Sequence, residues 1–169
     1  MNNYIINIFG AMTTGKSTLA ETLQKHIERA YTVDYDVVKK QISGFYSKRD
    51  REVATKITYD TLSSVSQTEL PIIALLPPPK NERTYLQVEE TGRKVINVEL
   101  VAPLDILVSR YDERLRALKQ QGEDISKLRT VDEFKETVQT PYFKPSNSHT
   151  FDSYRQSPDE IFEAVKSLI

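Results

Sequence analysis

The sequence predicts an α/β fold of three layers, in which a five-stranded parallel sheet lies between two layers of helices. Short apolar segments alternate with longer amphipathic segments about five times along the 169 residues, which is the pattern of repeated βα units. The first apolar segment runs directly into a glycine-bounded loop and then into an amphipathic segment, as expected of a buried parallel strand and its helix. Without repeats or linkers, residues 1–169 are predicted to form one domain.

Each strand is predicted where apolar and β-branched residues cluster and a breaking residue ends the run. The first run stops at a glycine and the third is closed by three prolines, which cannot continue a strand or a helix. The predicted strands are residues 4–9, 31–35, 71–76, 95–101 and 149–152.

Helices are predicted between the strands. In the first, Leu19, Leu23 and Ile27 recur every four residues and mark one apolar face of a helix that runs to about residue 30. Pro103 is expected at the first position of a later helix, and two capping boxes, at residues 130–133 and 157–160, each open a further helix. The remaining predicted helices are residues 36–43, 49–68 and 81–92, with Gly92 as the last one's C-cap.

Composition excludes several classes of function. The chain has no cysteine and only two histidines, which excludes disulfides, thiol catalysis, thiolate zinc sites and histidine-rich metal sites. With 23 basic and 24 acidic residues the net charge is −1, so a generally basic, DNA-coating surface is excluded. No apolar run is long enough to cross a bilayer and the first residues do not look like a signal peptide, so we expect a cytoplasmic protein.

The glycine-bounded loop matches the phosphate-binding pattern G-x-x-x-x-G-K-[ST], the Walker A motif or P-loop. Glycines let successive backbone N–H groups turn toward a phosphate, and the first turn of the next helix adds further donors and a positive dipole end. Lys16 is expected to bridge the terminal phosphates, and the Ser17 hydroxyl is expected to bind Mg²⁺. The predicted nucleotide-binding residues are Gly10, Ala11, Met12, Thr13, Thr14, Gly15, Lys16, Ser17 and Thr18.

The acidic residues after the second strand point to the second substrate. Asp36 follows that strand, in the crevice where ligands of open α/β sheets bind, and phosphoryl transfer to an alcohol needs a carboxylate to orient and deprotonate the nucleophile. Two alternatives stay open at this point: Asp36 caps the next helix, or Asp34 is the base. Asp34 is also a candidate to hold Mg²⁺ through water.

Together with the P-loop, the pattern Asp36-Val37-Val38-Lys39 resembles the polynucleotide-kinase-like and zeta-toxin-like group of small P-loop kinases. The resemblance implies a P-loop NTPase fold that is adenylate-kinase-like with a small lid, and it implies that Asp36 is the general base. Lys39 stands where that group commonly has arginine, so its contact with the acceptor or phosphate would be a point charge and not a bidentate fork.

The resemblance also implies a pair of lid arginines on the helix after the fourth strand. Arg110 and Arg114 are four residues apart on one helix face, and positive charge there would neutralise the phosphoryl group in transit. Without the resemblance, a solvated charged face is the simpler interpretation. The expected lid covers about residues 110–130, and further arginine candidates are Arg93, Arg116 and Arg129.

The predicted function is therefore an ATP-dependent P-loop kinase with Mg²⁺ that phosphorylates a hydroxyl. The expected acceptor is a small molecule, a nucleoside or nucleotide, or a polynucleotide 5′ end, with residues 45–68 as its cover. The third strand runs into Pro77-Pro78-Pro79-Lys80 with no acid, whereas many P-loop enzymes have a magnesium-binding aspartate there. The alternative is consequently an ATP-binding regulatory module with weak or no kinase activity. A GTPase switch is not expected, because the sequence lacks the guanine-reading and switch motifs of that class.

Overall fold

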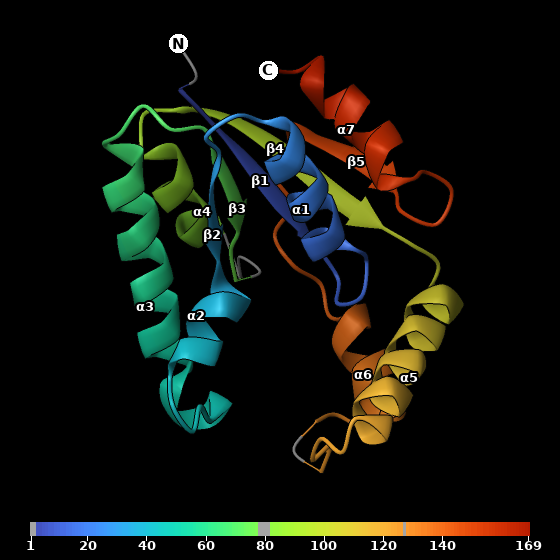
Figure 1. The fold of residues 1–169 in the computed structure, drawn as a ribbon. Coiled ribbons are helices and arrows are strands. Elements are labelled where there is room, and N and C mark those ends of the chain that lie inside the picture. Colours follow the sequence, from blue (N-terminus) through green and yellow to red (C-terminus); the bar gives the residue numbers. More distant parts are fainter. Residues whose placement is uncertain (1–2, 78–81, 127) are drawn as a thin grey trace.

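The structure is a computed structural model that describes residues 3–77, 82–126 and 128–169. A central sheet separates two groups of helices: α1 and α7 cover one face, and α3 and α4 cover the other (Figure 1). The helices α5 and α6 pack on each other beyond one end of the sheet. The predicted three-layer α/β fold is thereby confirmed.

The sheet has five strands, all parallel, in the order β2-β3-β1-β4-β5. Because all strands run the same way, their carboxyl ends meet at one edge, where open α/β sheets bind ligands. The P-loop strand is the central one, between β3 and β4. The strands are β1 (Tyr4–Gly10), β2 (Tyr31–Asp34), β3 (Ile72–Leu75), β4 (Lys94–Val101) and β5 (Ser148–Asp152).

Side chains alternate between two apolar cores along the central strands. Ile6 and Ile8 face α1 and α7, whereas Ile5 faces the core under α3 and α4. The helices are α1 (Lys16–His26), α2 (Tyr35–Gln41), α3 (Ser47–Ser66), α4 (Glu82–Glu89), α5 (Leu104–Gln120), α6 (Val131–Gln139) and α7 (Pro158–Lys166). Both predicted capping boxes, at Thr130 and Ser157, are formed. None of the described helices is long and apolar enough to span a membrane.

Several predicted helix boundaries were wrong: α2 ends at Gln41, α3 spans Ser47–Ser66 and α4 ends at Glu89, where 43, 49–68 and 92 were predicted. The first helix ends at His26 because Ile27 is extended, although its N–H still bonds to the Leu23 carbonyl and its side chain still packs on the core. Apolar spacing therefore continued beyond the helix. Helix α2 begins at Tyr35, one residue earlier than predicted. Pro103 is the residue before α5 and not its first residue, since its backbone is still extended there.

Arg93 does not approach the carboxyl edge of the sheet. It precedes β4 and is only 6% exposed, and its guanidinium donates to the carbonyl oxygens of Val65, Ser66, Thr68 and Leu70. These carbonyls belong to the end of α3 and the turn that follows, where the helix dipole favours a cation. Burial lowers the pKa of Arg93, and the carbonyls satisfy its donors. The expectation that Arg93 could reach a nucleotide was wrong.

Candidate active site

The P-loop follows β1 at the carboxyl edge of the sheet, and its glycines have backbone conformations that side chains rarely adopt. Gly10 has φ +137° and Gly15 has φ +90°. A Cβ on Gly10 would lie 2.2 Å from the Leu100 carbonyl oxygen of the neighbouring strand. The first glycine of the motif is thus required by the close approach of β4 as well as by its φ angle.

Threonine hydroxyls hold the loop in shape. The Thr14 hydroxyl is buried and donates to the Ala11 carbonyl over 2.9 Å. Thr13 has φ +63°, and its hydroxyl donates to the carbonyl of Leu107 on α5 over 3.0 Å. The loop is therefore closed on itself at one threonine and tied to α5 at the other.

Helix α1 begins at Lys16, so Lys16, Ser17 and Thr18 form its first turn directly after the loop. Backbone N–H groups in a first helical turn have no partner within the helix and can bind an anion. Ser17 and Thr18 are exposed. The Lys16 ammonium lies across the loop and donates to the carbonyls of Gly10 and Ala11, at 3.0 and 2.6 Å.

The charge on Lys16 depends on its surroundings. Burial lowers its pKa to about 8, while the carboxylates of Asp36 and then Asp34 act in the opposite direction. Asp34 is the last residue of β2 and Asp36 lies just after it, two strands away from β1 in the sheet, yet the charges of both act on the P-loop lysine. The fold therefore brings the predicted acidic residues to the phosphate loop.

This lowered pKa predicts that Mg-ATP binding weakens as the pH rises. A protonated Lys16 attracts the terminal phosphates and a neutral one does not, so the dissociation constant should rise by about tenfold for each unit above pH 8. Titration calorimetry between pH 7.5 and 9.5 measures this slope and the proton taken up on binding. The slope should vanish in Lys16→Met and persist in the exposed control Lys25→Met. An unchanged dissociation constant up to pH 9.5 would contradict the prediction.

The two aspartates have different local roles. Asp34 is the N-cap of α2, because its Oδ1 accepts from the Asp36 N–H at 2.7 Å. The alternative in which Asp36 is the cap was therefore wrong. Asp36 lies in the first turn, with its side chain 65% exposed and its Oδ1 2.5 Å from Lys39 Nζ. Lys39 also lies over the rings of Tyr35 and Phe45, and its contact with an acceptor or a phosphate stays a prediction.

The candidate arginines are distributed unevenly around the loop. Arg110 is half-buried and donates to the Thr13 carbonyl of the P-loop and to Ser153 in the turn after β5. Arg129, which precedes α6, is exposed and lies 4.0 Å from Met12 Sδ in the loop. Arg114 is exposed, and Arg116 pairs with Asp112 on the exposed side of α5. Arg110 and Arg129 therefore reach the loop, whereas Arg116 is directed to solvent.

Arg129 is held at the loop by its surroundings. Its carbonyl accepts from the Tyr111 hydroxyl at 2.8 Å, and Tyr111 stacks on Phe134 with ring centroids 4.1 Å apart. The next residue, Thr130, caps α6. No local sequence pattern around Arg129 indicates this placement, because it depends on how α5 and α6 pack.

Two polar residues of β4 belong to the site's surroundings and were missed by the sequence-based predictions. Asn97 and Glu99 are buried within a strand whose other residues are mostly apolar. A charged side chain inside a predicted buried strand is a signal that it has partners. That signal was visible in the sequence, but it did not identify which residues are the partners.

The donor set fits magnesium only together with a bound nucleotide. Among the described residues there is no group of three or more histidines or acidic residues that could hold a metal ion. The Ser17 hydroxyl and Asp34 are oxygen donors of the kind that Mg²⁺ prefers, and a triphosphate would supply the others. β3 ends at Leu75, and the described residues after it, Leu76 and Pro77, are not acidic; residues 78–81 lie outside the described part.

The five-stranded parallel sheet, its order and the P-loop at the carboxyl edge define a P-loop kinase fold. The sequence model of the adenylylsulphate kinase family matches residues 2–148, which is most of the chain. The chain therefore belongs to the adenylylsulphate kinase family. No curated protein matches it.

Solved structures of kinases have the same fold. A putative kinase from Chloroflexus aurantiacus is 19% identical with a TM-score of 0.77, and all of both chains is covered. Shikimate kinase from Aquifex aeolicus is 20% identical, covering 97% of this chain and 95% of that one, with a TM-score of 0.57. An adenylylsulphate (APS) kinase from Mycobacterium tuberculosis, in complex with AMPPNP and APS, is 19% identical, covering 98% and 96%, with a TM-score of 0.61.

Proposed function

We propose that this protein transfers the γ-phosphate of ATP to a hydroxyl group, with Asp36 as the general base. The observation that carries the proposal is the position of the two aspartates, whose charges act on the P-loop lysine. A carboxylate close to the terminal phosphates can orient an acceptor hydroxyl and remove its proton as the new P–O bond forms. Kinase folds and the family membership support the same reaction class.

The roles of the other residues follow from their places in the site. Lys16 and the first-turn N–H groups of α1 hold the phosphates, and Ser17 holds Mg²⁺, with Asp34 bound to the metal through water. Lys39 keeps the Asp36 carboxylate in place through their 2.5 Å contact. When bound, Mg²⁺ would neutralise charge on the triphosphate.

The lid is assigned to the α5–α6 pair, including residues 110–130. Arg110 lies between the loop and the turn after β5, and Arg129 lies beside the loop. We assign both to contacts with the nucleotide. Arg114, one helical turn beyond Arg110 and exposed, is the residue we assign to the transferred phosphate once the lid closes.

The acceptor is proposed to be a small hydroxyl compound, held between the P-loop and α2–α3. Adenylylsulphate is the first candidate because the family is named for it. The likeness of Asp36-Val37-Val38-Lys39 to polynucleotide-kinase-like and zeta-toxin-like enzymes makes nucleic-acid 5′ ends and sugar hydroxyls the next candidates. A modest basic cluster after β2, which includes Lys40, Lys48 and Arg51, supports testing oligonucleotides.

A panel of acceptors tests the proposal. Purified protein is incubated with Mg-[γ-³²P]ATP and adenylylsulphate, shikimate, sugars, nucleosides, nucleotides and oligonucleotides with 5′ hydroxyls. Transfer of label to any of them supports the kinase, and transfer to adenylylsulphate alone fixes the acceptor. Tight Mg-ATP binding with no transfer across the panel would favour the alternative, an ATP-binding regulatory module.

A further inference from the structure

A buried carboxylate lies beside the strand that carries the P-loop. Glu99 is 6% exposed, and its backbone pairs with Phe9, the residue before Gly10. Its neighbours Val98 and Leu100 face the core under α1 and α7, so Glu99 projects from the opposite face of the sheet. An ionised carboxylate at such a site needs hydrogen-bond donors to remain stable.

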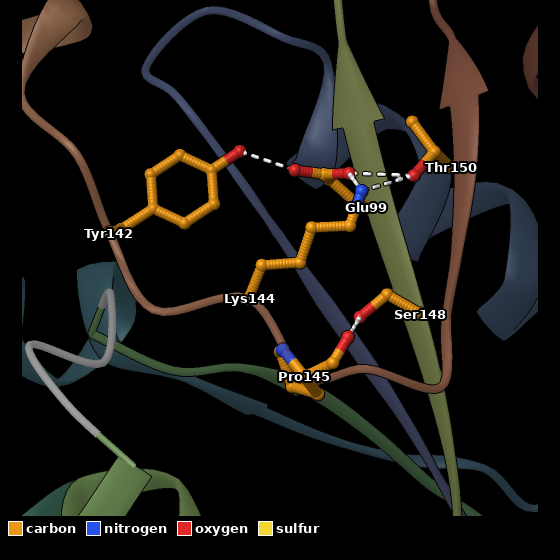
Figure 2. Close-up of polar contacts among 6 residues, drawn as sticks. All are labelled: Glu99, Tyr142, Lys144, Pro145, Ser148 and Thr150. Atoms are coloured by element: carbon orange, nitrogen blue, oxygen red, sulfur yellow. Dashed lines mark hydrogen bonds and ion pairs between the residues drawn. The ribbon is translucent and has the colours of Figure 1, made fainter.

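Three donors surround Glu99 and come from two elements (Figure 2). The Tyr142 hydroxyl donates to Oε1 at 2.8 Å, and Lys144 Nζ and the Thr150 hydroxyl donate to Oε2 at 2.5 and 2.7 Å. Thr150 belongs to the neighbouring strand β5. Tyr142 and Lys144 belong to residues 140–147, the segment that leads from α6 back to the sheet, which we call the return segment.

The charge state of the cluster favours this arrangement. Burial raises the pKa of Glu99, but hydrogen bonds from Lys144, Thr150 and Tyr142 outweigh it and hold the pKa below its ordinary value. Burial and then the bond to Glu99 raise the pKa of Tyr142. At neutral pH the carboxylate is therefore ionised and the phenol protonated, which gives charge-assisted bonds.

The return segment is held to the sheet at further points. Asn97, two residues before Glu99 and on the same face, donates to Asn147 at 2.9 Å and to the Tyr85 hydroxyl at 2.6 Å. It also accepts from Asn7 of β1 at 2.9 Å. The Tyr142 ring meets the Phe9 ring edge-on, with centroids 6.1 Å apart. The segment thus lies against the strand that leads into the P-loop.

The return segment is one of the two stretches of chain that join the α5–α6 pair to the strands of the sheet. The other is residues 102–103, and the pair has its own apolar contacts through Leu107, Tyr111 and Phe134. We propose that Glu99 is a positioning residue that fixes the return segment, and with it the end of α6, relative to the P-loop. This proposal rests on the proposed function, in which the arginines of the α5–α6 pair contact the nucleotide. By fixing the return segment, Glu99 would hold these arginines in place over the nucleotide.

Three variants separate positioning from general stabilisation. Glu99→Gln removes the charge, and Tyr142→Phe removes one bond to the return segment with little change of shape. Thr150→Val is the comparison variant: it removes the bond that Thr150 donates to Glu99 and the bond that it accepts from Lys144 Nζ at 2.8 Å, but it leaves both direct bonds between Glu99 and the return segment. Each is measured by thermal unfolding, Mg-ATP affinity, the rate of phosphoryl transfer to an acceptor (or to water) and amide hydrogen exchange.

In Glu99→Gln and Tyr142→Phe, we expect hydrogen exchange in residues 141–147 to become at least about tenfold faster. Phosphoryl transfer should fall by about tenfold, with Mg-ATP affinity within about twofold of the original. Thr150→Val should change both exchange and transfer less than the other two variants, because Tyr142 and Lys144 still bond directly to Glu99. Equal effects in Thr150→Val and Tyr142→Phe, or unchanged exchange in Glu99→Gln, would overturn the proposal. If the original protein transfers no phosphate at all, the proposed function fails while the exchange comparison still decides the role of Glu99.

Discussion

Replacing Asp36 with asparagine is expected to lower phosphoryl transfer by a hundredfold or more, on the order of the 10²–10⁴ that a general base contributes. Asparagine keeps the size of the side chain and its place in the first turn of α2, but it cannot accept the acceptor's proton. Removing the Asp36 charge lowers the pKa of Lys16 further, so Mg-ATP affinity is compared below pH 7. There it should not weaken, because Lys16 stays protonated and the backbone donors of the P-loop are unchanged. Transfer rates at saturating acceptor and calorimetric ATP titrations measure the two quantities separately.

The control for this variant is Asp60→Asn. Asp60 is an exposed aspartate on α3 that pairs with Lys56 at 2.5 Å, much as Asp36 pairs with Lys39, but it has no place in the proposed site. The Asp60→Asn variant should transfer phosphate at the rate of the original protein. Asp34→Asn tests the rival base: loss of transfer in that variant, with activity kept in Asp36→Asn, would reverse the assignment. If Asp34 binds the metal through water, Asp34→Asn should need a higher Mg²⁺ concentration to reach the same rate of transfer.

Replacing Gly10 with alanine is expected to abolish Mg-ATP binding and to destabilise the fold. The added Cβ would lie 2.2 Å from the Leu100 carbonyl oxygen, with the backbone at φ +137°, so β1 and β4 must separate at the start of the loop. Backbone strain and overpacking together cost about 2–5 kcal/mol of the free energy of unfolding. For a chain of this size that is a fall of roughly 5–15 °C in melting temperature.

Gly92 provides the matched control for Gly10, because it lies outside the proposed lid. It has φ +71°, and a Cβ there would have no heavy atom within 4 Å, so Gly92→Ala adds the backbone strain without the steric clash. That variant should lose about 1–2 kcal/mol of the free energy of unfolding and retain ATP binding. Calorimetric melting and ATP titration of both variants measure the difference. Equal losses in the two would mean that the contact with Leu100 does not matter.

Much of the fold could be predicted because its signals are local. All five strands, the parallel sheet and the P-loop depend on runs of apolar residues and on glycines, which are visible in the sequence. The capping boxes at Thr130 and Ser157 were also predicted correctly, since each needs only two residues three positions apart. Helix ends were less predictable: Ile27 continues the apolar spacing of α1 although its backbone is extended, because burial and helical conformation are separate requirements.

The roles within the site that could not be assigned from the sequence depend on contacts between distant segments. Arg93 and Arg129 are both arginines without a local motif, yet one is buried against the end of α3 and the other reaches Met12. Only the packing of α3, α5 and α6 distinguishes them. Asp34 and Asp36 could be named as alternatives from the sequence, but their division of roles depends on the hydrogen bond between the Asp36 N–H and the Asp34 carboxylate.

The order of strands in the sheet has a consequence for how this enzyme could diversify. The aspartates lie at the carboxyl end of β2 at one edge, while Ser153 follows β5 at the other, and the P-loop strand lies between them. Under the proposed roles, the residues that choose the acceptor and those that border the nucleotide are thus supplied by opposite edges. Mutations in α2 and α3 can alter which alcohol is accepted while the nucleotide side stays intact. A gene encoding this fold can therefore acquire a new substrate by changing one edge of the sheet at a time.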